Sequence, residues 1–147
     1  MSTSTNRSAA SIAGNLATAL FAVIIVLQLL LAAGILPVSM AWGGQQSTLT
    51  SGLRLASLAA AALLVFFAYV VRRRAGLFSN SSPSRKIKVL SWMITVFLVL
   101  NTLGNLASQS SGERILFGTI SLLLAVSCFV VSFSKPKILA TENLRGP

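Results

Sequence analysis

Four long apolar segments constrain this chain more than any other feature of its sequence. They cover residues 16–36, 53–71, 89–107 and 115–133, and Arg54 is the one charged residue within them. About 20 apolar residues in a helix cross the roughly 30 Å hydrocarbon core of a bilayer. Backbone groups in lipid must be satisfied within their own segment, which favours helices. The sequence therefore predicts an all-α fold: a single four-helix transmembrane bundle over 16–133, running up-down-up-down, with polar tails at 1–15 and 134–147.

The composition agrees with a membrane protein. Of the 147 residues, 54% are hydrophobic and 10% are charged, whereas about a quarter of a soluble domain is charged. The formal net charge is +10, but the positive residues fall between the apolar segments and form no solvated face. We therefore expect the bilayer, with anionic lipid headgroups, as the partner of these charges, and no nucleic acid.

The residues available for chemistry are few. The chain has no His and no Asp; its acids are Glu113 and Glu142, and Cys128 is its one cysteine. These residues cannot assemble a catalytic triad, a zinc site or a carboxylate dyad. We expect no enzymatic activity, no metal and no cofactor.

The distribution of Lys and Arg predicts the orientation. Of the 12 basic residues, Arg54 and Arg114 fall on one side of the bundle and the other ten on the opposite side. The positive-inside rule then places both termini in the cytoplasm. A cleaved leader is disfavoured, because the first apolar segment is longer than the usual core of about 7 to 15 residues. The connection between the second and third segments carries the candidate contacts to anionic lipid, although a topological anchor is the favoured role: Arg72, Arg73, Arg74, Arg85, Lys86 and Lys88.

Helical periodicity assigns faces to the last two segments. The third has a polar arc, made of Ser91, Thr95, Asn101, Thr102, Asn105, Ser108 and Gln109. Its opposite arc is apolar, made of Val96, Phe97, Val99, Leu100, Leu103 and Leu106. The fourth has a seam of small residues that Arg114 extends, made of Gly118, Ser121, Ala125, Cys128 and Ser132. We expect the polar arc to face the bundle and the seam to pack closely on a neighbouring helix. Cys128 lies on that seam, which favours a packing role.

A polar cluster is predicted in the half of the bundle away from the cytoplasm. Gln28 and Asn101 each lie 12 residues from the cytoplasmic start of their segments, about 18 Å deep. Asn105 lies about one turn further out, and Arg54 marks the outer end of the second segment. The favoured role of these residues is to fasten the helices by interhelical hydrogen bonds. The alternative is a binding site for a ligand or ion.

Glu113 has two predicted roles. Ser110 and Glu113 match a capping box, in which Ser110 would be the N-cap of the fourth helix. Glu113 could also pair with Arg54 and latch the second and fourth helices at the outer surface. The two roles are compatible. The uncharged loop 37–52 could close a small pocket over the cluster, although a simple turn is favoured.

Short elements of the chain resemble a group of small bacterial four-span membrane proteins that have no assigned activity. These elements are MAWGGQ at 40–45, Arg54, NTLGN at 101–105, AS at 107–108 and ER at 113–114. The resemblance implies a bacterial inner-membrane location. Small multidrug transporters have a similar size, but they need a membrane-embedded Glu in the first span, where this chain has Gln28.

The sequence leaves two hypotheses for function. The favoured one is a non-enzymatic accessory or structural membrane subunit that acts through helix–helix contacts, with a homo-oligomer or another membrane protein as partner. The alternative is a small oligomeric transporter or channel with a polar site at Gln28, Asn101 and Asn105. A lipid-modifying enzyme would lack acid–base groups.

Overall fold

The computed structural model describes residues 3–41, 48–78 and 82–134, and this part of the chain is helical with no strand. The elements are α1 (Thr3–Ala33), a short 3-10 turn η1 (Val38–Met40), α2 (Ser51–Arg74), α3 (Arg85–Leu106), a π-helical turn η3 (Glu113–Phe117) and α4 (Gly118–Phe133). Four stretches are long and apolar enough to cross a membrane: Ala9–Ala33, Ser51–Arg74, Arg85–Leu106 and Glu113–Phe133. The predicted four-helix fold is confirmed, and it fits a multi-pass integral membrane protein.

The first helix differs from its predicted bounds at both ends. It begins at Thr3, inside the segment expected to be a polar tail. No Gly or Pro interrupts the chain before Gly14, so an apolar helix can extend backward at little cost. It ends at Ala33, three residues before the predicted end, because Gly34 adopts a left-handed conformation with φ of 80°. Pro37 follows and cannot continue a helix.

Side-chain caps start the next two helices. The Thr50 hydroxyl accepts a hydrogen bond from Leu53 N at 3.2 Å at the start of α2. The Ser84 hydroxyl accepts one from Ile87 N at 3.4 Å at the start of α3. Each cap satisfies a backbone donor that has no partner within its helix. Thr50 is one of several Ser and Thr residues before the second apolar segment that could have been the N-cap of this helix.

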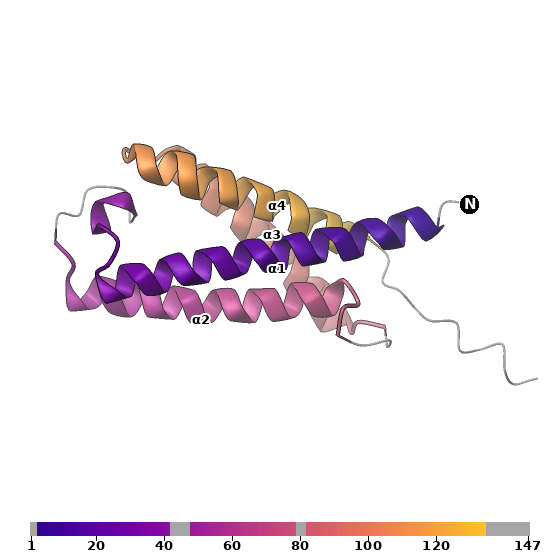
Figure 1. Ribbon diagram of the computed structural model, residues 1–147. Helices are drawn as coiled ribbons and strands as arrows, with labels where there is room; N and C mark the ends of the chain where they lie inside the picture. The colour runs from indigo at the N-terminus through magenta and orange to yellow at the C-terminus, as the bar shows by residue number, and fades with distance from the viewer. Residues whose placement is uncertain (1–2, 42–47, 79–81, 135–147) are drawn as a thin grey trace, which may run out of the picture.

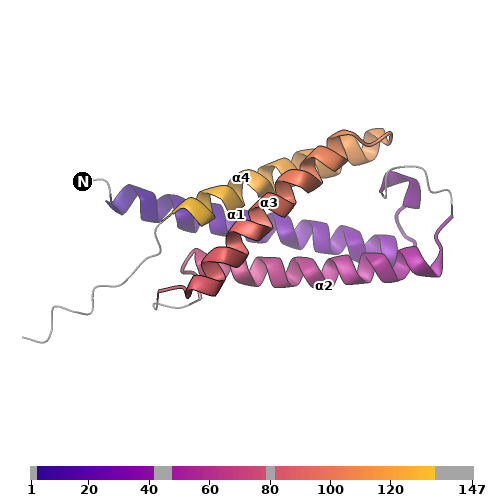
Figure 2. The same cartoon turned by 180° about the vertical axis from the view of Figure 1, so that it is seen from behind.

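The helices form two antiparallel hairpins. Helix α1 packs along α2, and α3 packs along α4, whereas α2 and α3 touch only sparsely. Figures 1 and 2 show that the hairpins lie against each other near the end that holds the α2–α3 connection and spread apart toward the other end. The turn η1 lies at that open end, between the hairpins (Figure 1).

The small seam and the apolar arc predicted from periodicity are confirmed, whereas Asn101 and Gln109 of the predicted polar arc are exposed. Every residue of the small seam on the fourth helix is buried, and Cys128 is fully so. The predicted apolar arc of α3 is exposed along its length, as expected of a surface that faces lipid. The main core joins all four helices and includes Phe21, Phe67, Leu98, Leu124 and Val131. The Phe67 ring lies in edge-to-face contact with Phe97, with centroids 5.5 Å apart, so these two rings bridge α2 and α3.

We predict that Gly14→Ala destabilises the protein. A Cβ at Gly14 would lie 2.7 Å from Ala75 Cβ, where α1 crosses the end of α2. Such overpacking costs about 1 to 3 kcal/mol. Gly104→Ala is the matched control, because nothing lies within 4 Å of a Cβ there, and the change should be neutral or stabilising by up to about 1 kcal/mol. Thermal unfolding in detergent measures both, and equal stability of the two variants would contradict the close contact.

Candidate functional site

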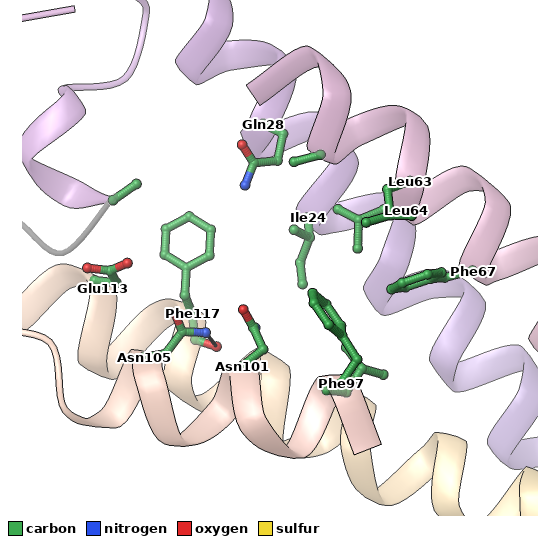
Figure 3. Close-up of a pocket in the computed structure, with 13 residues that line it drawn as sticks. Ile24, Gln28, Leu63, Leu64, Phe67, Phe97, Asn101, Asn105, Glu113 and Phe117 are labelled. Atoms are coloured by element: carbon green, nitrogen blue, oxygen red, sulfur yellow. Dashed lines mark hydrogen bonds between the residues drawn. The ribbon is translucent and has the colours of Figure 1, made fainter. Parts of the chain in front are cut away.

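A cavity of about 270 Å³ lies between the two hairpins. Its walls come from α1, α2, α3 and η3, and they include Gln28, Asn101, Asn105 and Glu113 beside apolar side chains. Figure 3 shows these polar residues arranged around one space, with the Phe117 ring standing between Gln28 and the α3 amides. Three of the four residues of the predicted cluster therefore line one cavity, and Glu113 joins them.

The segment after α1 closes part of the cavity. Ala41 lines it and is buried against Leu31 and Phe117 in a small apolar cluster of its own. This contact extends the bundle at the end where the hairpins spread apart. Residues 42–47 of the loop that could cover the cluster, Trp42 among them, lie outside the described residues.

Two of the amide side chains that line the cavity do not join helices by hydrogen bonds. Gln28 Oε1 is buried and accepts no hydrogen bond. Asn101 is exposed, and within the described part of the chain no hydrogen bond reaches its amide. In Figure 3 the Gln28 amide points from α1 into the space that Asn101 faces from α3. Both side chains thus keep hydrogen-bonding capacity directed into the cavity.

Asn105 fits the predicted fastening role. Its Nδ2 donates to Phe117 O at 3.4 Å and to Ser121 Oγ at 3.2 Å. Both partners lie at the start of the fourth helix, so this amide ties α3 to α4 within one hairpin. Asn101 and Asn105 therefore have different roles, although they lie one turn apart on the same helix.

Glu113 is held at the edge of the cavity by its neighbours. It is 9% exposed, and its Oε2 accepts a hydrogen bond from Ser108 Oγ at 2.5 Å. The Ser110 hydroxyl accepts from Glu113 N at 3.3 Å, as the predicted cap requires. Ser110 N donates to Ser108 Oγ at 3.1 Å. The Ser108 hydroxyl thus lies between the two residues of the capping box.

The π-helical turn η3 decides which charged residue faces inward. Gly118 N bonds to Glu113 O, five residues back, so the turn is one residue wider than an α-helical one. At α-helical spacing Arg114 would continue the small seam, as the sequence predicts. In the structure Glu113 is buried there and Arg114 is exposed, so the expectation for Arg114 is wrong. The wider turn delays the rotation by about one residue, or about 100°.

Arg54 lies apart from the cavity. Its Nη1 donates to Ala32 O at 2.9 Å, near the C-terminal end of α1. A cation there satisfies a terminal carbonyl and opposes the negative end of the helix dipole. Arg54 thus closes the first hairpin at its open end. Its predicted pairing with Glu113 stays a prediction.

A second arginine has the corresponding position at the other end of α2. Arg74 is buried, and its Nη2 donates to Ser132 O at 2.8 Å and to Ser134 O at 2.6 Å. It therefore ties the first hairpin to the end of α4. Beside it, Ser132 Oγ bonds with Ser91 Oγ at 2.5 Å and with Thr95 Oγ1 at 3.1 Å. We call these contacts of Arg74, Ser132 and Ser134 the joint at Arg74. The sequence indicates this joint only through the small seam and the polar arc, whose residues contribute to it.

The other basic residues of the α2–α3 connection differ in environment. Arg72 is half-buried and lies over the Phe78 ring, 4.7 Å from its centroid. Arg85, Lys86 and Lys88 are exposed at the start of α3, and Arg73 is half-buried. The predicted lipid contacts thus include three exposed cations and a buried one, Arg74. The remaining basic residues of the C-terminal tail, Lys135, Lys137 and Arg145, lie outside the described residues.

We predict that Arg74→Gln lowers the free energy of unfolding by about 2 kcal/mol, because it removes buried, charge-assisted hydrogen bonds. Arg85→Gln makes the same change in charge at an exposed position and should stay within about 0.5 kcal/mol of the wild type. Thermal unfolding in a mild detergent compares them. Equal effects would mean that Arg74 acts only through its charge.

A second pair of variants distinguishes the roles of Asn101 and Asn105, the two amide side chains on α3. Asn105→Leu should cost about 1 kcal/mol of stability, since it breaks the bonds to Phe117 and Ser121. Asn101→Leu should leave stability unchanged or raise it, because no bond is lost. If both variants lost stability equally, Asn101 would be a fastener as well.

Comparison with protein-family models, with curated proteins and with solved structures finds no match to this chain. The resemblance to small bacterial four-span proteins stays a prediction. The cavity and its polar lining are therefore the features from which a function can be inferred.

Proposed function

We propose that this protein is a non-enzymatic integral membrane protein that binds a small molecule in the cavity between its hairpins, as the binding subunit of a small transporter or channel. The observation that carries the proposal is the pair of amides at Gln28 and Asn101. Both face one cavity inside a segment that fits the membrane, and neither contributes to packing through a hydrogen bond.

The cost of burying such groups supports a binding role. A polar side chain inside a bilayer usually pairs with another group or marks a site of function. Asn105 shows that this chain can satisfy an amide through its own helices. That Gln28 Oε1 lacks a partner in the same region favours a ligand that supplies one. The volume of about 270 Å³ lies just under the usual range for small-molecule sites, about 300 to 1,000 Å³.

The residues around the cavity favour binding over catalysis. No His or Asp exists in the chain, and Cys128 is buried on the packing seam. Within the described residues no three His, Cys, Asp or Glu side chains gather. Among the described residues that line the cavity, Glu113 has the one carboxyl group, and one carboxyl group provides no acid–base pair.

A second candidate is the accessory subunit that acts through helix–helix contacts. The bonds of Asn105, and the cluster of Ser91, Thr95 and Ser132, favour it, because they use polar groups as internal fasteners. These bonds also account for the rigidity that a binding site needs. The cavity is lined by α1, α2, α3 and η3 of one chain, so each copy in an oligomer would hold a whole site.

We also propose how the protein lies in its membrane. The positive-inside rule favours cytoplasmic termini, and the resemblance favours a bacterial inner membrane. Arg85, Lys86 and Lys88 are suited to contact anionic headgroups, because they are exposed at the start of α3. The open end of the two hairpins would then face away from the cytoplasm.

Filling the cavity tests the proposed function. Ala60 lines the cavity, whereas Ala62 is exposed on the same helix and does not line it. We expect native mass spectrometry of the wild type in mild detergent to show a small noncovalent adduct, and the adduct to be absent from Ala60→Phe and present in Ala62→Phe. If Ala60→Phe keeps the same adduct, or if the wild type carries none across several detergents, the cavity is not a binding site.

A further inference from the structure

We propose that the ligand of this cavity is a small organic cation with an apolar or aromatic body, held by the Glu113 carboxylate and by the aromatic wall opposite it. The inference rests on the proposed function, since it assigns a chemical class to the ligand of the same site. It follows from the charge of the lining, from its acceptors and aromatic rings, and from the surface that leads to it.

The charge of the lining selects a cation. Among the described residues that line the cavity, Glu113 is the only charged one. Arg54 lies against the end of α1, and Arg114 is turned outward by η3. Inside a low-dielectric cavity the Glu113 carboxylate would attract a cation and repel an anion.

The uncharged lining fits the same class. Gln28 Oε1 is a buried acceptor without a partner, so it can accept from an ammonium N–H or face a positive dipole. Three phenyl rings, Phe67, Phe97 and Phe117, line the space. The faces of aromatic rings attract cations, most strongly where water is excluded. A hydrated inorganic ion would gain little from such walls, so an organic cation is the better match.

A route for an apolar ligand lies next to the cavity. A second hollow, of about 580 Å³, runs along the lipid-facing side of α3; its lining is apolar, with Trp92, Met93 and Leu100, except for Lys88. Phe97 lines both spaces. Helices α2 and α3 touch only sparsely beside it. A cation with an apolar body could therefore move from the bilayer past Phe97 to Glu113 without crossing the packed joint at Arg74.

Three probes of similar size test the class. The full chain, purified in mild detergent, is titrated calorimetrically with benzyltrimethylammonium, with neutral N-benzylacetamide and with benzenesulfonate. We expect the cation to bind at least about tenfold more tightly than either of the others. This ratio is measured on the wild type and needs no variant. Equal affinity for the cation and the amide, preference for the sulfonate, or no binding by a folded wild type would overturn the proposal.

The variant Glu113→Gln tests whether the Glu113 carboxylate causes the preference for the cationic probe. The glutamine has the same size, and its side-chain oxygen can still accept the hydrogen bond from Ser108. We expect the affinity for benzyltrimethylammonium to fall at least about tenfold and the affinity for N-benzylacetamide to change by less than about twofold. Glu142→Gln makes the same change in net charge and should leave all three affinities unchanged. An unaltered preference in Glu113→Gln would overturn the assignment.

The two proposals fail in different ways. If N-benzylacetamide binds as well as the cation and Ala60→Phe abolishes both, the cavity remains a binding site and only the cation class is lost. If Ala60→Phe changes neither probe binding nor the native adduct, the binding site itself is wrong.

Discussion

A backbone N–H or C=O inside hydrocarbon must find its hydrogen-bond partner within the protein, and this constraint shapes the whole chain. Two arginines, one at each end of α2, show how it is met. Arg54 donates to Ala32 O at the end of α1, and Arg74 donates to Ser132 O and Ser134 O at the end of α4. In each case a side-chain cation satisfies carbonyls that a helix end leaves without partners. The same helix thereby closes its own hairpin at one end and joins the other hairpin at the opposite end.

The joint at Arg74 explains the uneven spacing of the hairpins. The two hairpins are fastened at this end by the buried bonds of Arg74 to Ser132 O and Ser134 O. Beside them, the hydroxyls of Ser91 and Thr95 bond to the Ser132 hydroxyl and fasten α3 to α4 within the second hairpin. At the other end the space between them is occupied by Phe117 and Ala41, together with the cavity. A protein anchored at one end and spread at the other has room for a ligand without losing its core. The unpartnered amide of Gln28 lies where that room is.

The fold could be predicted from the sequence because hydrophobic length and periodicity act locally. The four apolar segments, the small seam around Cys128 and the lipid-facing arc of α3 all follow from side chains repeated at helical spacing. The cavity could be anticipated only in part, since matching depths suggested that Gln28 and Asn101 lie together but gave no volume. The division of roles between Asn101 and Asn105 could not be predicted, because it depends on where Phe117 and Ser121 lie on another helix. The bonds from Arg74 to the end of α4 could not be predicted either. A run of three arginines at a helix end has the same sequence whether its members contact lipid headgroups or a neighbouring helix.

The five residues of η3 have a consequence for how such a chain could change over time. Gly118 N reaches back to Glu113 O across one residue more than an ordinary turn, and a carboxylate instead of a guanidinium comes to face the interior. Insertion of one amino acid between Arg114 and Gly118, with the π-helical spacing kept, would put Arg114 in the place of Glu113 and reverse the sign of the charge that a bound molecule meets. The number of residues in this turn would then decide the charge of the preferred ligand, and two related proteins with nearly identical sequences could prefer oppositely charged ligands.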